Sequence, residues 1–331
     1  MKKYVFIIPL LFLFFFSSCD DKKTQTNRSS GKTAEMIVAT NGDDTWEGPV
    51  GENIRIFFGQ DYEVLSQQEP LFTMSHLPES KLVNNKMFRA HHNLFIVDIN
   101  SEFSENIIEA RKDLYSSPQR VIKITSPSED EFVNFFDEKK EAIYDILMDS
   151  EYERLIKTFK AFRDRDILNQ ISDNFGFTLE IPSGFYVAKI SADFIWIRKE
   201  TQHNSQGVMI YNYDFIDTLA FNKARILAFR NSITEEYIPG PSEGSYMVVA
   251  EEYSPIQINE IDFNGMFAIE TRGLWRLEGD FMGGSFVNYT FVDERTNKVV
   301  TIDGYVYAPN KPKRDLLIQM EAIAHSLTFV N

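Results

Sequence analysis

The chain has little cysteine and little positive charge. Its 331 residues include one cysteine, Cys19, which excludes an internal disulfide and a thiolate metal cluster. Its 34 lysines and arginines stand against 49 aspartates and glutamates, a formal net charge of −15. Because nucleic acids are bound through basic surfaces that release counterions, this balance excludes nucleic acid as the main partner.

Long apolar runs are lacking too, apart from one at the N-terminus. The run Tyr4–Phe16 covers about 13 residues, fewer than the roughly 20 that a spanning helix needs. Two lysines precede it, and Phe16-Ser17-Ser18-Cys19 ends it. The pattern predicts a lipoprotein signal peptide over residues 1–19 and lipidation of Cys19. Multiple acyl chains on Cys19 would anchor the protein stably to the membrane of a bacterial envelope, which we expect to be the outer membrane.

A polar segment follows the predicted lipidation site. Residues 20–33 have no apolar periodicity and predict a flexible tether. The tether would hold the remaining chain near the membrane, and the sequence leaves open whether that chain faces the periplasm or the outside.

The remaining chain has the composition of a folded protein. The sequence is 43% hydrophobic, and its length corresponds to about two domains. We predict an α+β fold of two tandem α/β units with mostly antiparallel sheets, an N-terminal domain over residues 34–175 and a C-terminal domain over residues 176–331.

The N-terminal unit combines strands with long helices. Apolar periodicity predicts a helix over Val50–Phe58 and strands at Ala34–Thr40, Asn93–Ile99 and Arg120–Thr125. Ser128-Glu129-Asp130-Glu131 is a capping box that opens another helix. A second capping box, Ser150-Glu151-Tyr152-Glu153, indicates either a new helix or a long kinked one that ends at Asn174-Phe175-Gly176.

The C-terminal unit is richer in strands. We expect a helix from Thr218 to about Ser232 and an amphipathic helix over Pro312–Leu327. The expected strands are Phe177–Ile181, Phe185–Ile190, Phe194–Lys199, Gly207–Tyr213, Tyr246–Glu251 and the β-meander Met266–Leu277, Ser285–Asp293 and Val299–Ala308. Both halves close with a strand, a proline-bearing loop and a helix. An internal duplication explains this order, and chance similarity is the alternative.

The start of the last helix carries an unusual charge pattern. Lys313 and Arg314 lie where the helix macrodipole disfavours cations. They either pair with carboxylates such as Asp280 or Asp315, or form an anion site with the free helix N–H groups. The glycine-rich stretch Gly279–Gly284 is interpreted as a turn or bulge, with a ligand-facing loop as the alternative. The candidate binding residues are Lys313, Arg314, Arg272, Trp275, Asp280, Gly283 and Gly284.

The sequence also contains residues for two other kinds of site, a sugar-binding surface and a serine hydrolase. The tryptophans and tyrosines serve either as packing or as a sugar-stacking platform, the latter including Trp196, Trp275, Tyr305 and Tyr307. Gly240-Pro241-Ser242-Glu243-Gly244 matches G-x-S-x-G, and His325 follows as a triad partner for Ser242. The match lacks the preceding strand and following helix of a nucleophile elbow. If His91 and His92 lie in a strand that leads into Leu94–Val97, their side chains point to opposite faces and cannot easily share a metal. The sequence has no other metal-binding pattern, so we predict no metal site, and we assign no catalytic residue or cofactor.

Several short motifs, together with the signal peptide, carry a family resemblance. They are Trp46-Glu47-Gly48-Pro49, Gln68-Glu69-Pro70, Ile181-Pro182-Ser183-Gly184-Phe185, Arg272-Gly273-Leu274-Trp275, Gly279–Gly284 and Tyr307-Ala308-Pro309 followed by Lys313-Arg314. The chain resembles a lipoprotein family of Bacteroidota that is catalogued as a domain of unknown function. The resemblance implies an envelope lipoprotein and brings no activity, cofactor or catalytic residue.

We therefore expect a non-enzymatic binding or assembly lipoprotein. Its C-terminal domain would recognise an envelope protein or an anionic envelope component through the candidate residues. A glycan-binding protein that uses surface Trp and Tyr is the alternative, and a serine hydrolase is the third hypothesis.

Overall fold

The computed structural model describes residues 27–330, and the predicted signal peptide, Cys19 and residues 20–26 of the predicted tether lie outside these residues. None of the described helices is both long and apolar enough to cross a membrane. The N-terminal half begins with a five-stranded sheet of order β3-β2-β4-β7-β5. Its strands are β2 (Glu35–Thr40), β3 (Thr73–Pro78), β4 (Asn93–Ile99), β5 (Ile107–Lys112) and β7 (Arg120–Ser126).

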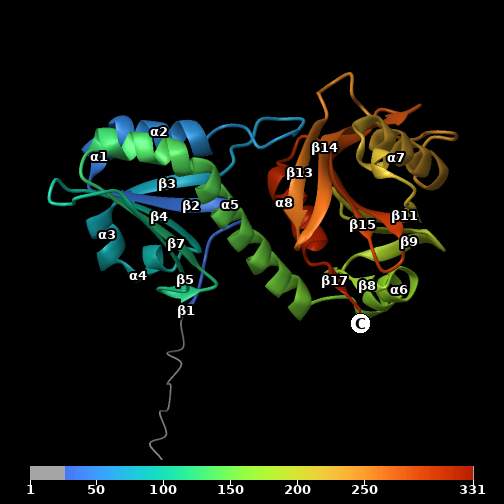
Figure 1. Cartoon of the computed structure of the whole chain (residues 1–331), viewed down its shortest axis with the longest axis horizontal. Coiled ribbons are helices and arrows are strands. Elements are labelled where there is room, and N and C mark those ends of the chain that lie inside the picture. The colour runs from blue at the N-terminus through green and yellow to red at the C-terminus, as the bar shows by residue number, and fades with distance from the viewer. Residues whose placement is uncertain (1–26, 331) are drawn as a thin grey trace, which may run out of the picture.

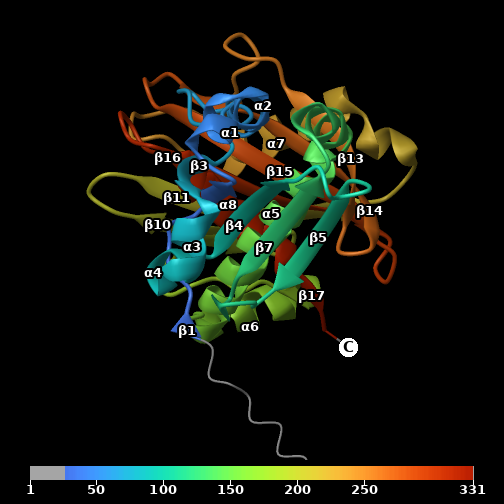
Figure 2. The same ribbon diagram turned by 90° about the vertical axis from the view of Figure 1, so that its left-hand side faces the viewer.

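This first sheet is parallel except for β5, so the expectation of mostly antiparallel sheets holds for the whole chain but not for this half. Figure 2 shows β4, β7 and β5 side by side. The apolar run of β4 follows from burial on both faces, because helices cover each side of a parallel sheet. The helices on one side are α1 (Asp43–Glu47), α2 (Pro49–Phe58) and α5 (Glu129–Ala161), and those on the other are α3 (Glu79–Asn84) and α4 (Lys86–Arg89).

Helix α5 joins the two halves. The Ser128 hydroxyl accepts a hydrogen bond from the Glu131 N–H, so the predicted capping box starts the helix. The second capping box lies inside the same helix, which continues for 33 residues to Ala161. Helix α6 (Arg165–Phe175) follows after a short break and ends at Gly176, whose φ of 71° explains the predicted glycine stop. The two helices are therefore separate rather than one kinked helix.

The C-terminal half is built on an eight-stranded, fully antiparallel sheet of order β12-β14-β15-β16-β11-β10-β9, with β13 also paired to β14. Its strands are β9 (Tyr186–Ser191), β10 (Phe194–Glu200), β11 (Ser205–Asp214), β12 (Tyr246–Val249), β13 (Gln257–Phe263), β14 (Met266–Glu278), β15 (Gly283–Asp293) and β16 (Lys298–Tyr307). The predicted meander is confirmed, whereas β3, β5 and β13 were missed.

Two helices cover opposite faces of this second sheet. Helix α8 (Arg314–His325) packs on the face that belongs to the large core shared by both halves, and α7 (Lys223–Tyr237) packs on the other. The helix expected from Thr218 begins as a 3-10 turn, Thr218–Phe221, before α7. Short pairs complete the fold: β1 (Asn27–Arg28) with β6 (Ser116–Ser117), and β8 (Phe177–Thr178) with β17 (Thr328–Phe329).

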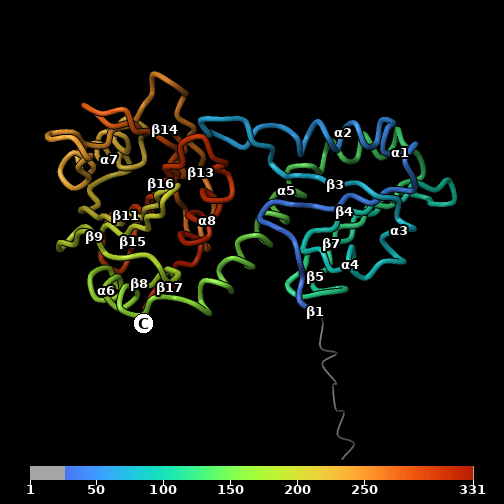
Figure 3. The backbone as a smooth tube through the Cα atoms, turned by 180° about the vertical axis from the view of Figure 1, so that it is seen from behind, coloured from blue at the N-terminus to red at the C-terminus, as the bar shows by residue number. Residues whose placement is uncertain are grey.

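The two halves differ in topology but share a core. One sheet is mainly parallel and the other antiparallel, so the duplication considered from the order of elements has no support in the structure. Helices α5 and α8 are in contact between the sheets, as Figures 1 and 3 show. The buried cluster runs from Val38 and Phe95 in the first half to Tyr289 and Ile318 in the second. This shared core places the start of α8 against the N-terminal half.

Candidate functional site

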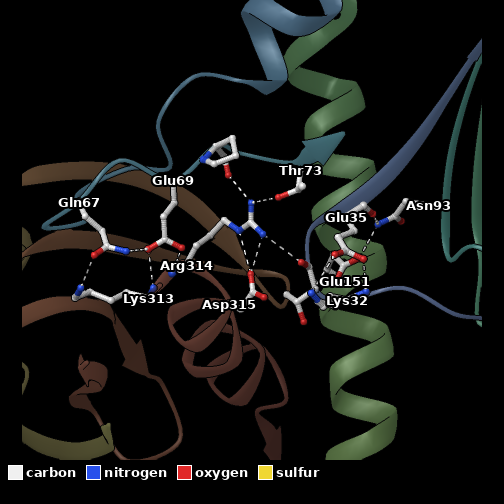
Figure 4. A network of polar contacts seen from close by, with 12 residues as sticks. Lys32, Glu35, Gln67, Glu69, Thr73, Asn93, Glu151, Lys313, Arg314 and Asp315 are labelled. Carbon is white, nitrogen blue, oxygen red and sulfur yellow. Dashed lines mark hydrogen bonds and ion pairs between the residues drawn. The ribbon is translucent and has the colours of Figure 1, made fainter. Parts of the chain in front are cut away.

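The cations at the start of α8 are buried rather than presented to a ligand. Lys313 is 4% exposed and Arg314 6%. The Glu69 carboxylate, from the loop between α2 and β3, accepts hydrogen bonds from the Lys313 N–H at 2.6 Å and the Arg314 N–H at 3.1 Å (Figure 4). A helix N-terminus favours such an anion, so the predicted anion position exists and is filled by the protein itself.

The Arg314 side chain adds a second link between the halves. Its guanidinium donates to the Pro70 carbonyl oxygen at 2.7 Å and the Thr33 carbonyl oxygen at 3.3 Å, and it pairs with Asp315 at 2.9 Å (Figure 4). The Lys313 ammonium donates to Gln67 Oε1 at 3.1 Å. Arg314 thus pairs internally with Asp315, as expected, whereas neither cation contacts Asp280 among the described residues. Both cations are buried and bonded within the protein, which argues against the ligand-binding role expected of them.

Arg272 is likewise committed within the protein. It is 8% exposed, binds Glu270 through two hydrogen bonds of 2.9 Å and pairs with Glu321 at 2.6 Å. Tyr62 and Tyr152, both from the N-terminal half, each donate to Glu321 at 2.6 Å. Burial raises the pKa of Glu270, but the Arg272 charge outweighs it and the pKa falls below its ordinary value. Arg272 therefore holds the interface instead of binding an anion.

The surroundings of Arg272 would also repel an anionic ligand. A cleft of about 500 Å³ between α5 and β13–β14 is lined in part by Arg272 and Glu270. Burial raises the pKa of Glu63, Asp145 and Asp149, which line the cleft. This acidic lining contradicts the hypothesis that Arg272 belongs to a site for an anionic envelope component.

The other four candidate residues do come together. They line a cavity of about 550 Å³ at the hairpin between β14 and β15. Its main lining residues are Tyr253, Trp275, Arg276, Asp280, Phe281, Met282, Gly283 and Gly284. Phe281 is fully exposed at the tip of this hairpin, and Tyr253 is 70% exposed. The glycine-rich stretch is therefore a turn that also lines a cavity, and the alternative of a ligand-facing loop stays a prediction.

A second cavity adjoins the first. It measures about 400 Å³ and shares Trp275 and Met282 with its neighbour. Its other main lining residues are Trp196, Arg198, Ile238, Pro239, Pro241, Met247, Leu277, Tyr305 and Tyr307. We call the two cavities together the Trp275 site. Their volumes fall within the range of protein ligand sites, and their walls are mainly aromatic and apolar.

Two buried donors of the Trp275 site have no acceptor among the described residues. Trp275 is 3% exposed, and its indole N–H has no hydrogen-bond partner within residues 27–330. Tyr305, 4% exposed, accepts a hydrogen bond of 3.0 Å from the Trp196 indole, which leaves the tyrosine's own O–H without a described acceptor. Buried donors are usually paired, because an unmade hydrogen bond costs about 1–3 kcal/mol. An acceptor atom of a ligand bound at this site would satisfy these donors.

Glycine makes this geometry possible. A Cβ on Gly284 would lie 1.9 Å from the Val306 carbonyl oxygen and 3.1 Å from Trp275 Nε1. Any larger residue there would collide with the neighbouring strand, so Gly284 lets the Trp275 indole lie against the β15 backbone. Gly283 and Gly284 are the first two residues of β15, and sequence alone could not show that they face a cavity.

The arginines around the site are already paired. Arg276 bonds Glu252 at 2.5 Å and Glu278 at 2.7 Å, and Arg198 pairs with Glu200. Asp280 accepts a 2.5 Å hydrogen bond from the Ser242 hydroxyl, which lowers the pKa of Asp280. The Trp275 site therefore presents apolar rings and neutral donors, with no surplus of positive charge.

The remaining candidates are structural. Ser242 lies on an exposed turn beside Asp280, whereas His325 stacks on Tyr152 with ring centroids 4.6 Å apart at the interface of the halves. The catalytic triad hypothesis is wrong, because these residues contact different parts of the molecule. Trp196, Trp275 and Tyr305 are buried, with Trp275 and Tyr305 packed edge to face, so they form no exposed sugar-stacking row.

The adjacent histidines His91 and His92 lie beside a buried carboxylate. His91 and His92 come before β4, which begins at Asn93, so the opposite faces expected for two residues in a strand do not apply. Their rings stack with centroids 4.7 Å apart. His92 lies 2.9 Å from the Glu151 carboxylate, and His91 contacts the Asn93 carbonyl oxygen. Within residues 27–330, no group of three or more histidine, cysteine, aspartate or glutamate side chains is placed to hold a metal ion.

Two family models match the chain, and both describe domains of unknown function. Residues 164–326 match DUF4837, and residues 29–160 match DUF8532. Uncharacterised domain families thus cover both halves. The two matches meet between residues 160 and 164, and the domain boundary near residue 175 stays a prediction.

Other comparisons add little. No curated protein matches the chain significantly. Among solved structures, a mutant of Protein Mog1 and the Saccharomyces cerevisiae Ran-binding protein Mog1p each show 9% identity and a TM-score of 0.31. Each alignment covers 47% of this chain and 92% or 91% of the other. At this TM-score the likeness indicates neither a shared fold nor a shared activity.

Proposed function

We propose that the chain is a lipid-anchored, non-enzymatic binding protein of the bacterial envelope, in a lipoprotein family of Bacteroidota. Its anchor is an acylated Cys19 in the outer membrane, and its Trp275 site binds an extended segment of another envelope protein. The signal peptide sequence supports the anchor. The single observation that supports binding is the buried, unpaired indole N–H of Trp275 beside an open cavity.

An extended polypeptide fits the chemistry of this site. Its carbonyl oxygens supply the acceptors that the Trp275 N–H and the Tyr305 O–H lack. An apolar side chain of the same segment would fill a cavity walled by aromatic rings and methionine. Aromatic residues and methionine are enriched at protein interfaces, and aromatic-lined grooves are a common mode of peptide recognition.

The surface around the cavity supports the same partner. Phe281 is fully exposed and Tyr253 is 70% exposed, and both line the opening of the larger cavity. Exposed aromatic side chains grouped at a cavity are typical of interaction surfaces, unlike single scattered ones. Since the neighbouring arginines are paired with glutamates, we expect a partner segment that is apolar and uncharged.

A site-specific crosslink tests the proposal in native envelopes. A photoreactive amino acid replaces Phe281 in the full chain, and a matched variant carries it at Ile216, an equally apolar residue that is 82% exposed elsewhere. We expect a discrete protein adduct from position 281 and none from position 216. Adding Trp275→Phe, which keeps an aromatic ring but removes the N–H, should weaken the adduct about five- to tenfold, the equivalent of one lost hydrogen bond.

The controls separate anchoring from binding. The Cys19→Ala chain should take no acyl label, and the Trp275→Phe chain should keep its thermal unfolding temperature within a few degrees. Equal crosslinking from positions 281 and 216 would contradict the protein-binding proposal. An adduct with glycan alone would show that the ligand of this site is a sugar rather than a polypeptide segment.

A further inference from the structure

A second cavity of different character lies at the end of α5. It measures about 390 Å³ and is formed where the first described residues pass over the last turns of this helix. We call it the basic pocket, and its main lining residues are Arg28, Ser29, Ser30, His92, Arg154 and Lys157. No carboxylate is among the residues that line it. In a chain with 15 more acidic than basic residues, such a lining is unusual.

The charges in the basic pocket are only partly neutralised. Arg154 pairs with the buried carboxylate of Glu151, which also lies 2.9 Å from His92 Nε2. Arg28 and Lys157 have no carboxylate within ion-pair distance among the described residues, and both are exposed to the cavity side of the surface. One acidic group thus faces three permanent cations, so the pocket carries a surplus of positive charge.

The basic pocket also offers donors without a hydrogen-bond partner among the described residues. Arg154 Nε is buried and has no hydrogen-bond partner within residues 27–330. The Ser30 carbonyl oxygen contacts His92 Nδ1 at 2.8 Å, which fixes the serine segment over the histidine. Gly31 permits this approach, because its φ is 116° and a Cβ there would lie 2.6 Å from both His91 and His92. The hydroxyls of Ser29 and Ser30 have no hydrogen bond among the described contacts.

Helix stability alone does not explain the arrangement. Cations near a helix C-terminus offset the macrodipole, which accounts for basic residues on α5 itself. It does not account for Arg28 and the two serines, which come from a separate segment and converge on the same cavity. Arginine, lysine and hydroxyl donors grouped around a small cavity are the usual means of binding a phosphate group.

We infer that the basic pocket binds the phosphate of an anionic phospholipid headgroup. The inference rests on the proposed function for one point, the lipid anchor. Arg28 is nine residue steps from Cys19 along the chain, so the pocket lies at most about 30 Å of extended chain from the acyl groups. Anionic headgroups attract nearby lysine and arginine, while the acidic remainder of the protein is repelled, so this end of the molecule faces the membrane.

Chemical footprinting of Lys157 tests the inference on the acylated full chain. Its acetylation rate is measured by mass spectrometry, with Lys139, an exposed lysine earlier on the same helix, as the internal reference. The protein is compared in neutral detergent, in neutral detergent with inorganic phosphate, in phosphatidylcholine vesicles and in vesicles that also contain phosphatidylglycerol. An ammonium held by phosphate reacts slowly, so we expect acetylation of Lys157 to fall about threefold or more with phosphatidylglycerol, with Lys139 unchanged.

Two variants make the result specific. Arg28→Gln should abolish the protection of Lys157, whereas Lys81→Gln, on the far side of the first sheet, should leave it intact. If inorganic phosphate protects Lys157 and Arg28→Gln removes this protection, the result supports a phosphate site. If inorganic phosphate protects Lys157 but phosphatidylglycerol does not, the result overturns the lipid headgroup as the source of the phosphate. Equal acetylation in all four conditions, or protection that survives Arg28→Gln, overturns the inference.

The two proposals fail separately. The phosphate measurement in detergent needs neither the membrane nor the Trp275 site, and the crosslink from position 281 needs no contact in the basic pocket. A lost crosslink with intact protection of Lys157 would reject only the protein-binding function.

Discussion

The contact between Glu69 and the start of α8 allows a quantitative prediction. Glu69→Ala removes a buried carboxylate that accepts two backbone hydrogen bonds, at 2.6 and 3.1 Å, from Lys313 and Arg314. Losing an N-terminal cap costs about 1 kcal/mol, and losing a partly buried charge that complements the macrodipole costs up to about 2 kcal/mol. We therefore expect the free energy of unfolding to fall by about 2–3 kcal/mol.

The conservative substitution should cost less. Glu69→Gln keeps one acceptor oxygen for the helix N–H groups but removes the charge, so we expect a loss of about 1–2 kcal/mol. The measurements are urea unfolding followed by circular dichroism and thermal unfolding, in which Glu69→Ala should lower the melting temperature by roughly 4–10 °C. Glu105→Ala, on an exposed loop of the N-terminal half, is the matched control.

The same variant reports on the link between the halves. Trp46 lies in the N-terminal half, whereas Trp196 and Trp275 lie in the C-terminal half. If Glu69 joins the halves, Glu69→Ala should separate the fluorescence transition of the tryptophans from the circular dichroism transition. Unfolding as stable and as cooperative as that of Glu105→Ala would refute the role of Glu69.

Two further predictions concern buried ion pairs. Burial raises the pKa of Glu151, but His92 and Arg154 outweigh this effect and lower the pKa to about 2. Because this pKa lies below that of the unfolded chain, ionised Glu151 contributes about 3 kcal/mol to the free energy of unfolding above about pH 5. This contribution is lost as the pH falls toward 2. Urea midpoints at pH 7, 5 and 3 should show this loss in the natural chain and not in Glu151→Gln, and parallel curves would contradict it. Arg230 and Asp303 are both fully buried and bonded at 2.7 Å. Arg230→Met leaves the Asp303 charge buried without a partner, so the free energy of unfolding should fall by about 3–5 kcal/mol. Adding Asp303→Leu removes that charge and should restore most of the lost stability. Arg225→Met, exposed on the same helix, is the control, and equal stability of the Arg230 single and double variants would contradict the reasoning.

Local chemistry explains what the sequence predicted well. The capping box at Ser128, the glycine stop at Gly176 and the β-meander depend on residues that are close along the chain. Trp275, Asp280, Gly283 and Gly284 meet at one cavity for the same reason, since a single hairpin, β14–β15, carries them all. Alternation along β14 also placed Arg272 and Trp275 on opposite faces.

Contacts between distant residues decided the rest. The cations at the start of α8 required a counterion, but Glu69 lies 244 residues from Lys313, and no local pattern selects it among 49 acidic residues. Arg272 depends on Glu321, 49 residues away, and the basic pocket joins Arg28 to Lys157 across the whole N-terminal half. Residue type and spacing by themselves predicted the capped helices, the β-meander and the charges that need partners, but not β3, β5 and β13. Only the packing of α5 and α8 between the two sheets decided which partners those charges have and which candidate residues remain open to a ligand.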